Sequence, residues 1–303
     1  MTVMEISKDI FSGLEALGFN NMENLELYKK EDKEQGKIVK EKAEPQINEA
    51  DYLFDRKVVC PVCGTDFTTR TVKKEGYQMK NSESDFYMNH RVINPYFYDV
   101  CVCNVCGYSS MKADFEKLRS YEVEKVQQNI TPKWTGRKYP EVYDINIAIE
   151  RYKLSLFNYT IIGAKASKKA MNCLKLSWMY REINDEENEK IFREQALIGF
   201  KEAYFNEDCP IYGMDKFRML YLIGELNRRS GNYDEALRYF GEVITSTMTD
   251  RKTKKIATEQ KDLIKEHLKA IEDSKKEVVK EDVKEIKKPG FFSRFFGKSQ
   301  IED

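Results

Sequence analysis

The sequence predicts a mainly α-helical protein, in which a small β-rich module precedes a short solenoid of helix pairs. Two observations lead to this fold class. Two Cys-x-x-Cys pairs stand among short β-type runs, and residues 142–244 show nearly continuous helical periodicity. Of the 303 residues, 41% are hydrophobic and 12% aromatic, which is enough apolar material for a core and argues against full-length disorder.

The charge balance limits the function classes. The chain carries 51 Lys and Arg residues against 51 Asp and Glu residues, so its formal net charge is zero although 34% of it is charged. Proteins that bind nucleic acid through bulk positive charge carry a basic excess, which this chain lacks. The charge balance does not rule out nucleic-acid binding through a local basic patch.

The N-terminal region, residues 1–28, is expected to form a short amphipathic helix. Ile6, Ile10, Leu14 and Leu17 recur at helical spacing, and Gly18 would end the helix. Residues 29–51 are rich in Lys, Glu, Gln and Asp and read as a charged linker.

The sequence also indicates the compartment. The first residues do not resemble a secretory signal, and no apolar run approaches the roughly 20 residues of a membrane span. The expectation is a cytoplasmic protein, in which the seven cysteines serve as thiols or metal ligands and not as disulfides.

Residues 52–130 are expected to form the β-rich module with a trailing helix. Short β-type runs cover residues 57–59, 67–72 and 96–102, and residues 113–128 have helical spacing.

The strongest chemical signal in this module is a pair of knuckles. Each is a Cys-x-x-Cys sequence followed by a glycine, Gly64 in the first and Gly107 in the second, and the four thiols are Cys60, Cys63, Cys103 and Cys106. Two thiolates separated by two residues can supply half of a tetrahedral site, and glycine lets the backbone turn. The residues between the knuckles suit an insertion between two β-hairpins, so the module is expected to be zinc-ribbon-like with structural Zn.

Other uses of the thiols have different requirements from a structural zinc site. A redox dithiol would need only one knuckle and a thioredoxin-like context, and a catalytic zinc would need an open position. Iron takes the same four thiolates and is not excluded. Cys101, Cys173 and Cys209 are interpreted as ordinary thiols.

The module resembles a known bacterial family. The resemblance rests on Tyr52, the two knuckles with their flanking residues, Ser84-Asp85-Phe86 and Asn94-Pro95-Tyr96-Phe97-Tyr98. These residues are similar to those of the domain-of-unknown-function 2225 family and extend over roughly residues 52–245. The resemblance implies a cytoplasmic, Firmicute-type protein with a double Cys-x-x-Cys module fused to tetratricopeptide-like helices, and it implies no activity. Asn104 stands where many members carry Pro, and the charged N-terminal lead is long.

Residues 140–248 are expected to form a tetratricopeptide-like helical domain. The expected helices cover residues 143–162, 166–183, 188–205, 214–230 and 233–247. In the clearest repeat, small Gly224 and Ala236 let two helices approach, while Tyr233 and Phe240 fill the space around them. A degenerate repeat lies around residues 176–203. Since one repeat cannot bury its own face, neighbouring helices would cap it in a short right-handed α-solenoid.

The first helix of each repeat would line a concave groove. The expected groove residues are Arg181, Arg218, Tyr221, Glu225 and Arg228. Guanidinium groups bind carboxylates in pairs of hydrogen bonds, so this groove would bind a carboxylate-rich or C-terminal peptide of a protein partner. The alternative is a solvated polar face.

The C-terminal part divides in two. Residues 249–289 read as a charged helix or tether, and residues 290–303 as an aromatic-basic tip. Its four phenylalanines beside basic residues could bind an anionic membrane at the inner face, dock on a partner, or fold back on the protein. They are Phe291, Phe292, Phe295 and Phe296.

Several patterns fail as catalytic signals. The chain has only two histidines, His90 and His267, so a catalytic triad has few candidate residues. The Gly297-Lys298-Ser299 sequence resembles the end of a P-loop, but Phe292 stands where that motif requires its first glycine. His90 is interpreted as a hydrogen-bonding residue. An enzyme is therefore the third hypothesis.

The leading hypothesis is a non-enzymatic zinc-binding adaptor that binds a protein partner through its helical groove. The alternative is a nucleic-acid-associated zinc-ribbon protein. Its only support is a basic and aromatic cluster of Arg70, Lys73, Lys74, Lys80, Arg91, Tyr77, Phe86 and Tyr87.

Overall fold

The computed structural model describes Gly18 and residues 48–286, with side chains as far as residue 274. The predicted N-terminal helix apart from Gly18, almost all of the linker and the aromatic-basic tip with its four phenylalanines lie outside the described residues.

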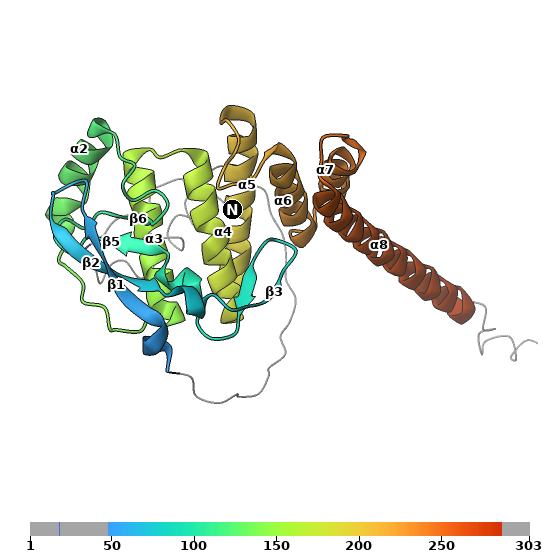
Figure 1. Cartoon of the computed structure of the whole chain (residues 1–303). Helices are drawn as coiled ribbons and strands as arrows, with labels where there is room; N and C mark the ends of the chain where they lie inside the picture. Colours follow the sequence, from blue (N-terminus) through green and yellow to red (C-terminus); the bar gives the residue numbers. More distant parts are fainter. Residues whose placement is uncertain (1–17, 19–47, 287–303) are drawn as a thin grey trace, which may run out of the picture.

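The described chain begins with three antiparallel hairpins (Figure 1). β1 (Leu53–Val59) pairs with β2 (Asp66–Val72), β3 (Met79–Ser82) with β4 (Met88–His90), and β5 (Val100–Val102) with β6 (Ser109–Met111). Short 3-10 turns connect or flank them: η2 (Glu49–Tyr52), η3 (Lys74–Gly76) and η4 (Pro95–Tyr98). Each hairpin is a separate two-stranded sheet, so the strands are stabilised by packing against the helices.

Helices make up the rest of the described chain. They are α2 (Ser120–Asn129), the 3-10 turn η5 (Thr131–Lys133), α3 (Ile145–Ile162), α4 (Ala166–Glu182), α5 (Glu186–Asn206), α6 (Lys216–Arg229), α7 (Tyr233–Thr245) and α8 (Arg251–Ile286). Successive helices from α3 to α8 pack on one another, as short connections require. Asp144 and Asp215 cap the N-termini of α3 and α6, and Gly163 ends α3 in the left-handed conformation.

One sequence expectation is wrong at its start. The helix predicted over residues 113–128 begins only at Ser120. The preceding segment forms turns, in which Asp114 and Phe115 are both buried. The Asp114 carboxylate accepts hydrogen bonds from Tyr159 and Tyr212, and the Phe115 ring lies 4.9 Å from that of Tyr108.

α3 joins the hairpins to the helices. The side chain of Asn158 accepts a hydrogen bond from the Ser109 amide and donates one to the Ser109 hydroxyl, and the Tyr159 hydroxyl accepts from the Met111 amide. Arg151 donates to the Val100 carbonyl from the same helix. One cluster of buried apolar residues therefore runs from the knuckles through α3 into α7 and α8.

α6 and α7 approach closely at a glycine. A Cβ atom on Gly224 would lie 2.8 Å from the Phe240 ring, which is too close for two unbonded carbon atoms. Ala236 is fully buried on α7. Only a residue without a side chain at position 224 lets Phe240 fill this interface.

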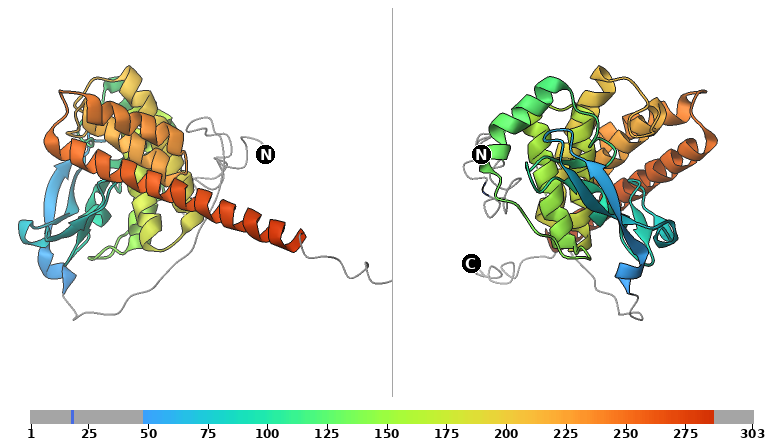
Figure 2. Two further views of the ribbon diagram at one scale, coloured as in Figure 1. Left: turned by 90° about the vertical axis from the view of Figure 1, so that its right-hand side faces the viewer. Right: turned by 60° about the vertical axis from the view of Figure 1, so that its left-hand side comes forward.

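α8 begins against α6 and α7 and then extends past the body of the molecule (Figure 2). Ala257 and Ile264 are buried near its start, whereas Leu263 and Ile271 are exposed. Among the described residues, no helix is both long and apolar enough to cross a membrane.

Candidate metal centre

The first and third hairpins carry the four cysteines in matching positions. Residues 60–65 connect β1 to β2, and residues 103–108 connect β5 to β6. In the first turn the Cys60 amide donates to Thr65 and the Gly64 amide to Cys60, and Cys103 and Gly107 repeat this pattern in the second. Gly64 and Gly107 have φ of 71° and 76°, a conformation that strains any residue with a Cβ atom.

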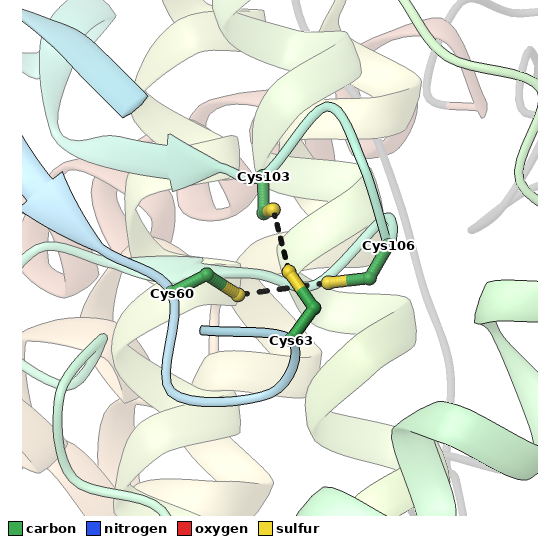
Figure 3. A group of neighbouring side chains, drawn as sticks. All are labelled: Cys60, Cys63, Cys103 and Cys106. Carbon is green, nitrogen blue, oxygen red and sulfur yellow. Dashed lines mark hydrogen bonds between the residues drawn. The ribbon is translucent and has the colours of Figure 1, made fainter. Parts of the chain in front are cut away.

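The two turns bring four sulfur atoms together (Figure 3). All four lie within 4.8 Å of one another, and the Cys60–Cys106 and Cys63–Cys103 Sγ pairs are each 3.6 Å apart. Four sulfur atoms bound to zinc at about 2.3 Å in a tetrahedron would lie about 3.8 Å from one another. The arrangement therefore fits a four-thiolate metal site, and zinc and iron share this ligand set.

Proton affinities in the cluster are unequal. Contacts with the sulfur atoms of Cys106 and Cys60 lower the pKa of Cys103, helped by backbone hydrogen bonds from Cys106 and Val105. The contact with Cys103 raises the pKa of Cys106 and of Cys60. A metal ion binds cysteine as the thiolate, so its binding would displace the protons that these thiols carry.

The centre is closed on most sides. Cys60, Cys103 and Cys106 are buried, and Cys63 is exposed with its sulfur 3.2 Å from the Thr65 hydroxyl. Within the described residues this is the one group of His, Cys, Asp or Glu side chains close enough together to hold a metal ion. Four protein sulfur atoms fill a tetrahedral shell, so such a metal would be structural.

A second layer of residues surrounds the knuckles and was not predicted from the sequence. Gln127 of α2 donates to the Val62 carbonyl at 3.1 Å, Thr131 of η5 donates to the Cys106 carbonyl at 3.0 Å, and Trp134 donates to the Asn104 carbonyl at 2.9 Å. The Trp134 ring also lies against Gly107, where a Cβ atom would be 2.8 Å from it. One short segment, residues 127–134, therefore contacts both knuckles.

Asn104 has a role that proline could not fill in the same way. Its side-chain oxygen accepts a hydrogen bond from the Arg137 amide, while its backbone carbonyl accepts from Trp134. The second knuckle is thereby tied to the segment that leads into α3.

The other cysteines and His90 lie apart from this cluster. Cys101 and Cys173 are buried, and burial raises the pKa of both thiols. Cys209 is exposed. The His90 ring lies edge-on to Tyr96, and burial lowers its pKa; its Nδ1 atom has no hydrogen-bond partner.

The predicted groove residues lie at an interface within the chain. The loop between β3 and β4 carries residues 83–86, Glu-Ser-Asp-Phe, which we call the acidic tip, and this tip covers the face of α4 and α6. Arg181 binds Glu83 and Asp85, Tyr221 donates to the Ser84 carbonyl, and Arg218 lies over the Phe86 ring. Glu225 is fully buried, accepts from Ser84 and pairs with Arg228. The carboxylates expected from a partner thus come from the chain itself.

The basic cluster of the alternative hypothesis is only partly exposed. Arg70 pairs with Asp55 and Glu141, and Lys73 donates to the Asp51 carbonyl. Tyr87 is buried against Trp178. The exposed members are Lys73, Lys74, Tyr77, Lys80 and Arg91.

A family model described as an uncharacterized protein conserved in bacteria (DUF2225) matches residues 53–267. The chain belongs to the DUF2225 family. That match covers all three hairpins and the helices as far as the first part of α8. No curated protein and no solved structure matches the chain.

Proposed function

We propose that this DUF2225 protein is a non-enzymatic, zinc-binding adaptor that binds a protein partner through its helices. In this proposal the knuckles form a zinc-ribbon-like module, and α3 to α7 form a short tetratricopeptide-like solenoid. The closed set of four sulfur atoms supports structural zinc, because it leaves no ligand position for a substrate.

One observation carries the adaptor part of the proposal. The face of α4 and α6 already holds a peptide segment, through two carboxylates, a backbone carbonyl and an aromatic ring. A surface that binds one polypeptide segment in this way has the chemistry to bind others.

The nucleic-acid alternative is weaker than it was on the sequence alone, because Arg70 is paired with Asp55 and Glu141 and Tyr87 is buried. A cytoplasmic location and contact of the C-terminal tip with the inner membrane face remain predictions.

Affinity capture from the native cell tests the adaptor function. The tagged full chain is compared with Arg218→Glu, on the proposed binding face, and with Arg238→Glu, a matched exposed arginine on α7. We expect a specific protein that both the native chain and Arg238→Glu retain and Arg218→Glu loses. Capture of no protein, or of proteins indifferent to Arg218, would contradict the proposal.

A further inference from the structure

Charge holds the acidic tip in place. Glu83 lies 2.6 Å from Arg181 Nη1 and 3.2 Å from Arg229 Nη2, and Asp85 lies 2.6 Å from Arg181 Nη2. Trp178 donates a further hydrogen bond to Asp85 at 3.1 Å. Asp85 is fully buried, so its charge depends on these partners.

The same face also contacts an aromatic ring and the backbone of the acidic tip. The Phe86 ring lies 5.3 Å from the Tyr221 ring and 5.2 Å from the Arg218 guanidinium. The Tyr221 hydroxyl donates to the Ser84 carbonyl at 2.8 Å. Phe86 adopts φ of 70°, which is unfavourable for a residue with a side chain, so the loop is strained where it docks.

The hairpin that presents the tip is weakly held on one side. All four residues of β3 are exposed, and β3 pairs only with β4. On the other side Tyr87 is buried, 5.3 Å from Trp178, and forms an anchor. Release of the tip therefore requires a local movement of residues before Tyr87, without loss of the helices.

Two of the arginines that bind the acidic tip also have carboxylate partners on the helices. Arg181 also binds Glu189 at 2.9 Å, and Arg229 also binds Glu225 at 2.8 Å. Loss of Glu83 and Asp85 would nevertheless remove carboxylate partners from Arg181 and Arg229, next to two further guanidinium groups on the same face. We call this set the arginine face: Arg181, Arg218, Arg228 and Arg229.

We infer that the arginine face is a recognition site for an acidic-aromatic segment of a partner protein, and that the acidic tip is its internal competitor. The segment would carry two acidic residues separated by one other residue, with an aromatic residue directly after the second. Glu83, Asp85 and Phe86 have this arrangement in the acidic tip. This inference rests on the proposed adaptor function and names the class of its ligand.

A synthetic peptide tests the competition. The probe is a fluorescent nonapeptide that copies residues 81–89, and binding is followed by fluorescence anisotropy. The full chain is compared with a released variant, Glu83→Ala with Asp85→Ala and Phe86→Ala, and with a control, Met79→Ala with Met88→Ala, which alters exposed side chains of the same hairpin.

We expect the released variant to bind the probe about tenfold or more tightly than the native chain and the control, because a tethered competitor acts at millimolar effective concentration. A probe with lysine at both acidic positions should bind none of them. Far-UV circular dichroism and metal content verify that the released variant is folded. A folded released variant that binds no better than the control overturns the inference.

Hydrogen exchange on the native chain gives a second measurement that needs no variant. Excess acidic probe should increase exchange in residues 79–90, and the lysine probe should not. Unchanged exchange at saturating probe overturns the inference as well. If capture from the cell depends on Arg218 but no probe binds, this inference fails and the adaptor function stands.

Discussion

The two knuckle glycines have the same backbone conformation but different surroundings. A Cβ atom on Gly64 would meet nothing within 4 Å, whereas one on Gly107 would meet the Trp134 ring at 2.8 Å. Gly64→Ala should therefore cost only backbone strain, about 1 kcal/mol of the free energy of unfolding. Gly107→Ala adds a steric clash and should cost about 2–4 kcal/mol.

Urea denaturation of the two metal-loaded variants checks this difference. Equal losses of stability would show that Trp134 does not pack on the second knuckle.

Asp85 gives a pH-dependent prediction. Burial alone would raise the pKa of Asp85, but the guanidinium groups of Arg181 and Arg229 hold it below its usual value of 3.8. The ionised carboxylate therefore stabilises the fold above that pH, and this contribution is lost as the pH falls below it. At pH 7, Asp85→Asn should cost about 3 kcal/mol, because it leaves guanidinium groups without their buried partner.

Melting of the native chain and Asp85→Asn between pH 7 and pH 3 measures this contribution. Metal loss in acid affects both proteins, so the gap between them isolates Asp85. The gap should stay constant above about pH 5 and narrow below about pH 4. A gap that closes near pH 6, or no gap at pH 7, would contradict the assignment.

At the residue scale, local spacing predicted the four cysteines, because two residues between thiols define a knuckle by themselves. The second layer was not predictable in this way. Gln127 and Trp134 contact knuckle atoms 65 and 30 positions away, and no short-range pattern encodes such contacts. Trp134 is one of only two tryptophans in the chain, and this rarity is the only feature of the sequence that could have drawn attention to it.

At the scale of elements, the α6–α7 pair offers a matched glycine test. Gly224 faces the Phe240 ring, whereas a Cβ atom on Gly241 of α7 would meet nothing within 4 Å. Gly224→Ala should destabilise by about 1–3 kcal/mol through the clash with Phe240. Gly241→Ala should stabilise by about 0.5–1 kcal/mol, because alanine favours the helix.

Thermal denaturation of the two single variants decides the point. A Gly224→Ala protein as stable as the native chain would mean that the helices do not approach at this residue.

Most helices were predictable as elements, because their caps and breaks are local. Five helices were expected between residues 143 and 247. Each of them begins and ends within two residues of the corresponding helix in the structure, α3 to α7. The helix expected from residue 113 was wrong at its start, because Asp114 satisfies hydroxyl groups of Tyr159 and Tyr212, 45 and 98 positions away. The docking of the acidic tip on α4 and α6 is a long-range contact of the same kind.

At the scale of the whole molecule, the hairpins and helices share a core through α3, so metal removal should act beyond the knuckles. Trp134 lies at the metal centre, and Trp178 lies at the acidic tip. Single-tryptophan variants, Trp178→Phe and Trp134→Phe, report on each region by fluorescence. Chelation under reducing conditions should shift the Trp134 emission to the red, with a smaller change at Trp178.

Readdition of zinc should restore the Trp134 signal. No change at Trp134 upon complete metal removal would mean that the metal does not organise residues 127–134.

The central claim is that four thiolates hold one structural metal ion, and native mass spectrometry with elemental analysis tests it most directly. We expect one zinc per chain in the native protein, and Cys106→Ser should lose the metal and melt at lower temperature. Cys209→Ser, at an exposed cysteine outside the cluster, is the control and should keep its zinc. A native chain without bound metal, or a Cys106→Ser protein that is metal-free, folded and equally stable, would contradict the account.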